Sequence, residues 1–181
     1  MRPEQSIRER FIQSSIGSLT IAAAFQRANI YVKNVDKESS SDLRNFVFSE
    51  IQRLSYAYSH PVQEEQHKAN IVELSDSISC KYSAILQDGV FRIGIAQKAL
   101  NLYLKFLWCL DRIPMPPHCP VDALILKKTG NTKIRWTKIK TIVEYQEAIT
   151  ELKKAAGQLP LAKWELEQYV TPNFLLQDTK N

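Results

Sequence analysis

The chain has 181 residues, of which 44% are hydrophobic and 24% charged, and only five are glycines. This composition is typical of a globular protein with a sizeable core, and it argues against a disordered, collagen-like or repeat architecture. The net charge of +5 favours contact with phosphates or acidic partners, but it is too small for a dedicated nucleic-acid arm. An odd number of cysteines argues against a secreted disulfide framework and predicts a cytoplasmic protein; they are Cys80, Cys109 and Cys119.

Apolar residues at helical spacing predict a first helix over about 4–28, which carries a face of small residues. Its uncharged stretch is interrupted by glutamine and serines and is too short to span a bilayer, so we expect neither a membrane partner nor a signal peptide. The serines Ser39–Ser41 can cap a second amphipathic helix, which reaches Tyr58. A third helix is predicted over residues 61–88.

The segment from Val90 to Asp122 is the most distinctive part of the chain. Residues 90–113 form a helical pattern that is apolar nearly all round, and such a helix belongs at the centre of a fold. The four prolines between Ile113 and Pro120 prevent its continuation, because proline lacks an amide proton and clashes with the preceding turn. We therefore expect a rigid, extended connection after the central helix.

The remaining residues predict three further helical segments. Pro120 can begin a short helix, whereas Thr141 and Glu144 fit a capping box for a helix that ends at Gly157. A last amphipathic segment follows to about residue 170, and only residues 133–136 could be extended.

Helical segments without any useful stretch of alternating polarity predict an all-α fold. The expected architecture is an irregular bundle of about six to seven helices around the central apolar helix at approximately 90–113. We expect one helical domain over residues 1–172 and a flexible C-terminal tail over 173–181.

A thin basic stripe follows one edge of the predicted central helix. At 100° per residue, the side chains within about 60° of one another are Lys98, Asn101, Lys105 and Arg112. The cations supply charge and the amide supplies a donor and an acceptor, so the stripe could hold the phosphates of a nucleotide or a strand. Trp108 borders the stripe and could wall a pocket there. The alternative is that these lysines form the solvent edge of a buried helix.

The proline-rich turn carries a second candidate group, formed by His118 and Asp122. A histidine can act as a general acid or base near neutral pH, and the carboxylate could orient it. Alternatively, Asp122 begins a helix and complements its dipole. Cys119 lies beside them and would need a lowered pKa to act as a nucleophile. No ligand spacing typical of zinc occurs, so we expect neither a metal nor another cofactor.

Arg112 and His118 also form the pattern Arg-x5-His, which resembles the Arg-x4-6-His signature of HEPN-type ribonucleases. Members of that family are small helical domains that cleave RNA without metal. The resemblance implies that Arg112 would bind the phosphate and that His118 would act as the acid or base.

We therefore expect a protein that binds an anionic ligand, preferably nucleic acid or a nucleotide, at the basic helix edge beside the His-bearing turn. Two alternatives stay open. The chain could be a protein-interaction or homo-oligomerisation module that uses the small-residue face of its first helix or its Leu- and Trp-rich later helices, or a metal-independent ribonuclease that uses Arg112 and His118. The sequence leaves open whether any reaction is catalysed, and the common fingerprints of NTPases, dehydrogenases, zincins and hydrolases are absent.

Overall fold

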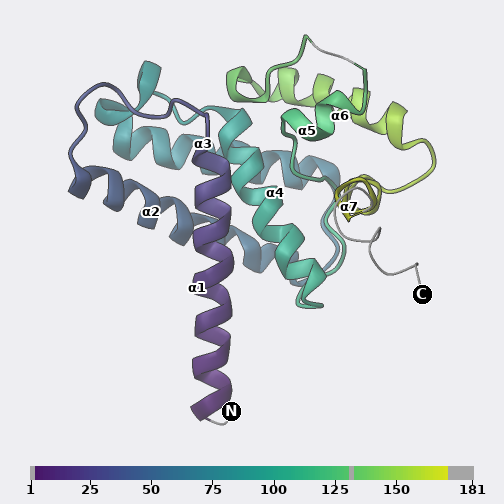
Figure 1. Ribbon diagram of the computed structural model, residues 1–181, viewed down its shortest axis with the longest axis horizontal. Coiled ribbons are helices and arrows are strands. Elements are labelled where there is room, and N and C mark those ends of the chain that lie inside the picture. Colours follow the sequence, from purple (N-terminus) through teal and green to yellow (C-terminus); the bar gives the residue numbers. More distant parts are fainter. Residues whose placement is uncertain (1–2, 131–132, 171–181) are drawn as a thin grey trace, which may run out of the picture.

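The computed structural model describes the backbone of residues 3–130 and 133–170, with the side chains from residue 6 onward in these ranges. Within them the chain forms seven α-helices and no β-strand, which confirms the predicted all-α class (Figure 1). The predicted tail at 173–181 lies outside the described residues. The helices are α1 (Pro3–Phe25), α2 (Lys37–Ser55), α3 (Glu64–Tyr82), α4 (Ile93–Cys109), α5 (Ala123–Lys127), α6 (Ile142–Ala156) and α7 (Leu161–Val170).

Short 3₁₀ turns account for several differences from the predicted boundaries. They are η1 (Tyr56–Ser59), η2 (Ser83–Ile85), η3 (Gln87–Gly89) and η4 (Trp136–Lys138). The third helix is therefore shorter than predicted, because η2 and η3 occupy its expected last turns. The backbone of Arg135 is extended, but Trp136 already begins η4.

Helix α4 is the central element of the bundle, as predicted. Twelve of its 17 residues are buried, and α1, α2, α3, α6 and η4 all contact it (Figure 1). Its apolar side chains face several directions, so neighbouring helices can cover it on more than one side. This arrangement places the predicted basic edge of α4 among other helices rather than at an open surface.

The helix ends follow local side-chain chemistry. Thr141 and Glu144 form the predicted capping box of α6, and Gly157 ends that helix at a φ of 62°. Asp122 caps α5 by accepting hydrogen bonds from the backbone of residues 124 and 125. Helix α2 corrects the prediction, because its cap is Asp36 and the three serines lie inside its first turns. An aspartate oxygen accepts from the free amides at a helix start as well as a serine does.

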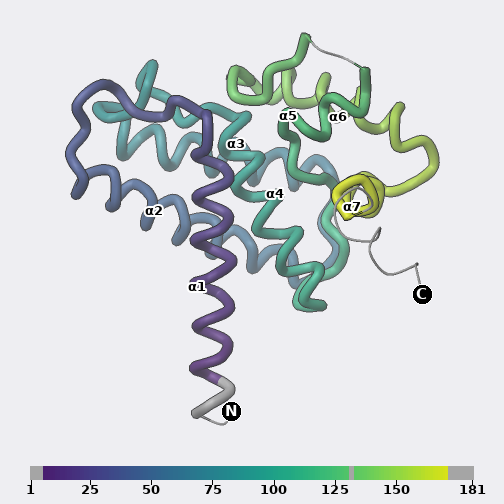
Figure 2. Tube along the Cα trace, in the orientation of Figure 1, coloured from purple at the N-terminus to yellow at the C-terminus, as the bar shows by residue number. Residues whose placement is uncertain are grey.

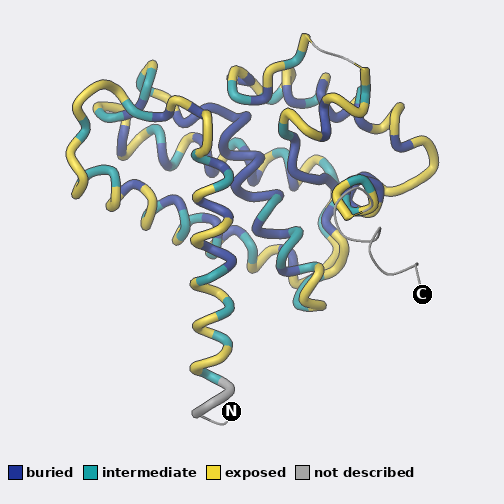
Figure 3. The backbone as a smooth tube through the Cα atoms, in the orientation of Figure 1, coloured by how far each residue is buried: buried dark blue, intermediate teal, exposed yellow. Residues whose placement is uncertain are grey.

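Helix α1 extends far beyond the other helices (Figure 2). Its second half packs on α4, and burial begins only at Ile16, whereas none of the described side chains from Ser6 to Ser15 is buried (Figure 3). None of the helices in the described ranges has the length and apolarity needed to cross a membrane.

Candidate functional site

Lys98, the first cation of the predicted stripe, is 9% exposed. Its Nζ lies 3.3 Å from Oδ2 of Asp122 and 4.4 Å from the ring centroid of Trp136. The carboxylate and the face of the indole both stabilise the ammonium group. The structure thus brings Lys98 and Asp122 together, as predicted neighbours of one site, but the lysine is already bound by protein groups.

Lys105 lies further along α4 and binds a residue of α7. Its Nζ is 2.7 Å from Oε2 of Glu165, with the two side chains only 12% and 8% exposed. The Tyr169 ring covers the same ammonium at 4.5 Å. Burial raises the pKa of Glu165, although Lys105 lowers it in part. This pair ties α4 to α7.

Arg112 lies beyond the end of α4 and binds Glu9 of α1, with Nη2 2.6 Å from Oε2. Trp108 is half-buried beside this part of the helix. Each of the three stripe cations therefore binds a carboxylate from a different element. In the described chain these ion pairs hold α1, α5 and α7 against α4, and they neutralise the charge that the sequence placed there.

Asn101 and His118 belong to a buried hydrogen-bonded cluster around Tyr145 of α6. Asn101 donates to the Tyr145 hydroxyl over 3.1 Å, and that hydroxyl lies 2.9 Å from Nδ1 of His118. Gln97 also binds Asn101, and its amide holds both backbone groups of Val121. All of these side chains are buried. The cluster thus fixes the end of the proline-rich turn against α4 and α6.

His118 has one hydrogen-bonded ring nitrogen, Nδ1, which bonds the Tyr145 hydroxyl that also accepts from Asn101. Its other ring nitrogen, Nε2, is buried and has no hydrogen-bond partner in the described chain. This Nε2 lies 3.7 Å from the carboxylate of Glu64, which itself binds Lys153. His118 is therefore held between a phenol and a carboxylate, in an orientation that its neighbours determine.

A second histidine, His67 of α3, packs edge-on against His118 with ring centroids 4.8 Å apart. Its Nδ1 bonds the Tyr58 hydroxyl over 2.7 Å, and Asn70 donates to the same hydroxyl. Burial lowers the pKa of both histidines to about 3, helped for His118 by the charges of Lys153 and Lys68. Both imidazoles are consequently neutral at neutral pH, and both have no exposed surface.

This arrangement bears on the resemblance to the HEPN ribonucleases. In the described chain no hydrogen bond or ion pair joins Arg112 to His118, since the arginine binds α1 and the histidine binds α6. Cys119 is also buried, and burial raises the pKa of its thiol. The described residues contain no group of three His, Cys, Asp or Glu side chains placed to hold a metal ion.

The segment from Lys127 to Lys140 is a functional candidate that the sequence reading did not single out. It contains six basic residues and no acidic one, and all six are exposed; they are Lys127, Lys128, Lys133, Arg135, Lys138 and Lys140. The rest of the chain has 18 basic and 19 acidic residues, so the net positive charge of the protein resides in this segment. The density of lysine and arginine over 14 residues was the signal that could have found it.

Contacts with α4 hold this basic segment in place. The amide of Gly94 donates to the carbonyl oxygen of Ile139 over 3.0 Å, and Trp136 is buried beneath Lys98. A Cβ at position 94 would lie 1.8 Å from the carbonyl oxygen of Trp136. Gly94 therefore permits the backbone of η4 to approach α4 closely.

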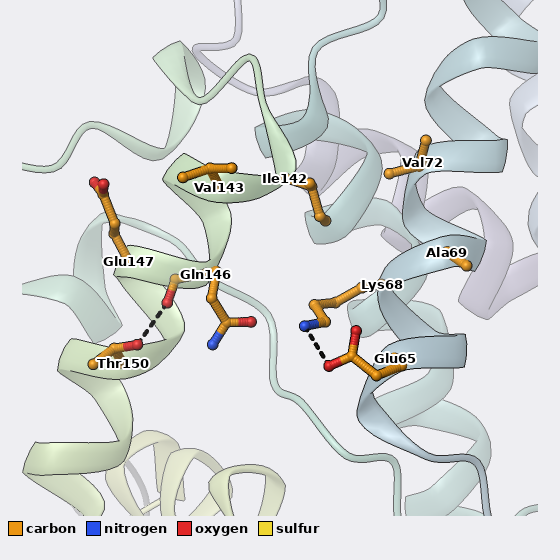
Figure 4. A pocket seen from close by; sticks show the side chains of 9 residues that line it. All are labelled: Glu65, Lys68, Ala69, Val72, Ile142, Val143, Gln146, Glu147 and Thr150. Carbon is orange, nitrogen blue, oxygen red and sulfur yellow. Dashed lines mark hydrogen bonds and ion pairs between the residues drawn. The ribbon is translucent and has the colours of Figure 1, made fainter.

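A surface pocket of about 540 Å³ lies between α3 and α6, beside the buried histidines. Its walls combine aliphatic side chains with an ion pair between Lys68 and Glu65 at 2.7 Å (Figure 4). Gln146 also lines it, with an amide oxygen that has no hydrogen-bond partner. Two carboxylates and one lysine are the charged groups of the pocket, and its lining residues are Glu65, Lys68, Ala69, Val72, Ile142, Val143, Gln146, Glu147 and Thr150.

Comparisons with known proteins were made at three levels. No family model, no curated protein and no solved structure matches this chain.

Proposed function

We propose that this protein binds an anionic ligand, preferably nucleic acid, through the basic segment 127–140. The observation that carries the proposal is the exposure of all six basic side chains in a segment without acidic residues. Lys140 also forms an ion pair with Asp88. Clustered exposed cations attract the regularly spaced phosphates of a nucleic-acid backbone, and their binding releases condensed counterions.

The predicted stripe on α4 has a supporting part in this proposal. Lys98 and Asp122 lie directly under the segment, because Lys98 contacts Trp136 and Asp122 caps α5, which ends at Lys127. Asn101 holds the turn that precedes α5 through Gln97. Lys105, Trp108 and Arg112 lie further along or beyond α4. The stripe positions the cationic surface, and the segment supplies the charges that reach the ligand.

The chemistry of the segment favours contact with phosphates over contact with bases. Five of its six cations are lysines, which act as point charges without the planar fork of arginine. Its tryptophan, Trp136, is 7% exposed and already covers Lys98, so it is not available for stacking on a base. We therefore expect binding with a strong dependence on salt and little preference for sequence. Cleavage is not part of this proposal, because His118 is buried and neutral.

The test compares two doubly substituted proteins of equal net charge. Lys128→Ala/Lys138→Ala removes two cations of the segment, whereas Lys33→Ala/Lys37→Ala removes two exposed cations, one in the turn before α2 and one at the first residue of α2. Anisotropy titrations with labelled duplex DNA and single-stranded RNA, at about 50 to 200 mM salt, give the slope of log K against log salt. For duplex DNA, we expect the magnitude of the slope to decrease by about 0.9 for each phosphate contact that the first variant loses. The slope of the second variant should equal that of the wild type. Equal slopes for all three proteins would overturn the proposal.

The three cysteines support a cytoplasmic location within the same proposal. All three are free thiols, and Cys80 and Cys109 are exposed. Free exposed thiols persist in a reducing compartment, whereas an oxidising one tends to pair them.

A further inference from the structure

The face of α1 that carries Ile7 and Phe11 has no packing partner in the described chain. Phe11 is 72% exposed and Ile7 60% exposed, on a stretch where no described side chain is buried before Ile16 (Figure 3). The opposite side of this stretch contacts the body of the protein, through the ion pair of Glu9 with Arg112 and the packing of Ile12 on the core. The exposed phenyl ring alone offers on the order of 100 Å² of apolar surface. This face of α1 therefore has the properties of a contact surface.

The second half of α1 forms one wall of a groove. With α2 it encloses a hollow of about 330 Å³, whose lining is Ser14, Gly17, Ser18, Ile21 and Ala22 of α1 and Ser41, Arg44, Asn45 and Phe48 of α2. The α1 side of the groove consists largely of small side chains, which leave space for an inserted group. The ring of Phe48 packs against Gly17, so that a Cβ at position 17 would lie 2.3 Å from it. Because a cavity of about 150 Å³ can hold benzene, the groove has room for one phenyl side chain.

The exposed apolar residues and the groove lie on the same face of α1. The residues of this face are spaced four, three, four and four positions apart, and at 100° per residue they fall within about 80° of one another; they are Ile7, Phe11, Ser14, Ser18 and Ala22. The body of the protein lies on the other side, because Glu9, which binds Arg112, points about 160° away from Phe11. A second helix could therefore lie along this face without disturbing the contacts of α1 with α4.

An antiparallel copy of α1 matches this face in register. A two-fold axis between Ser14 and Ser15 places Ile7 opposite Ala22 and Phe11 opposite Ser18, since both pairs are equally distant from that point. Each large apolar side chain then meets a small residue at the groove, and the same two contacts form twice. Such self-complementarity is the property of a closed two-fold interface.

We propose that the occupant of this face is a second copy of the chain, in a homodimer whose α1 helices pack antiparallel and exchange Phe11 into the groove between α1 and α2. A helix of 23 residues is about 34 Å long and about 10 Å wide. Counted on both copies, the accessible surface buried along the helix and in the groove is on the order of 1,000 Å². Specific protein–protein association begins at about this buried area. The dimer does not depend on the proposed nucleic-acid binding.

Sedimentation equilibrium and light scattering of the full chain test the dimer directly. The wild type should have twice the mass of the 20.8 kDa chain at micromolar concentration. Phe11→Glu places a charge in the interface and should weaken dimerisation at least tenfold while the circular dichroism spectrum stays unchanged. The matched control is Val143→Glu, which changes an exposed apolar residue on α6 and should leave the dimer intact. A wild-type monomer, or a dimer that Phe11→Glu does not weaken, would overturn the proposal.

Engineered cysteines test the direction of packing. In a Cys80→Ser/Cys109→Ser background, Phe11→Cys/Ser18→Cys should give a disulfide-linked dimer on oxidation, because residues 11 and 18 of different copies lie opposite each other. Phe11→Cys alone should give none, since the two copies of residue 11 are about 10 Å apart along the axis. Efficient cross-linking through Phe11→Cys alone would indicate parallel helices and contradict the proposed geometry.

Discussion

Gly94 of α4 lies directly against the backbone of Trp136, so that a Cβ at position 94 would come within 1.8 Å of the Trp136 carbonyl oxygen. We expect Gly94→Ala to lower the free energy of unfolding by roughly 1–3 kcal/mol, because overpacking against backbone forces η4 away from α4. Urea denaturation measures this change. Gly130→Ala is the control, since nothing lies within 4 Å of its Cβ and only the backbone strain of its φ of 73° remains. If the basic segment binds nucleic acid, Gly94→Ala should also weaken that binding without removing a charge.

The buried histidines predict a loss of stability in acid. An unfolded histidine titrates near pH 6.5, whereas burial lowers the folded pKa of His67 and His118 to about 3. Below pH 6.5 the unfolded chain binds protons that the folded chain excludes, so stability is complete above that pH and falls as the pH decreases towards 3. Each histidine contributes a slope of about 1.4 kcal/mol per pH unit.

Unfolding by urea at several pH values between about 6.5 and 4 measures this slope. Burial raises the pKa of Glu165, so the contribution of this carboxyl to stability decreases as the pH rises, opposite to that of the histidines. A Glu165→Gln protein should therefore show a steeper increase of stability with pH. A stability that is constant from pH 6.5 to 5 in that variant would contradict the buried, neutral state of the two histidines.

Tyr145→Phe tests the hydrogen-bonded cluster around His118. The substitution removes the hydroxyl that joins Asn101 to Nδ1 of His118 and leaves a buried ring nitrogen without a partner. Leaving one buried polar group unpaired costs about 1–3 kcal/mol, which thermal or urea unfolding would detect. Tyr56→Phe removes the hydroxyl of a side chain that is 80% exposed, and it should have no measurable effect. Equal stabilities for both variants would show that the cluster adds nothing to the fold.

Lys105 and Glu165 test whether the stripe on α4 is structural. Lys105→Ala should cost about 3–5 kcal/mol, because it leaves the buried carboxylate of Glu165 without its cation. The double variant Lys105→Met/Glu165→Leu should recover most of that loss, since an apolar pair of similar volume needs no desolvated charges. If the double variant regains stability and binds nucleic acid about as tightly as the wild type, Lys105 has a structural role only. If it regains stability but binds nucleic acid more weakly, Lys105 contributes to ligand binding.

The sequence predicted the helices better than the surroundings of their side chains. Periodicity identified α4 as the central helix, and the chemistry of Thr141 and Glu144 identified the start of α6, because both signals are local. The partners of the stripe are not local, since Lys105 binds a residue 60 positions away and Lys98 one 24 positions away. Spacing along a helix gives the direction of a side chain, but it does not give the element that lies opposite. Thus the sequence indicated that these side chains share one side of α4, but it did not predict their burial or their ion pairs.

The basic segment was missed for a different reason. Its six cations follow no helical or strand period, so a search for periodic patterns passed over them, whereas a simple count of charge would have found them. The same limit applies to His67, whose distance in sequence from His118 hides their edge-on contact.

Both ends of the region that carries the cationic segment are attached to a single turn of α4. Asp122 uses one carboxylate oxygen to cap α5 and the other to bind Lys98, while Ile139 accepts the amide proton of Gly94, four residues earlier. The chain between these points is a closed loop, and the entropy cost of closing it is incurred during folding. If the cationic segment binds an anion as proposed, both ends of the region are already attached before the ligand arrives. Less ordering then remains to reduce the affinity than in a disordered basic tail.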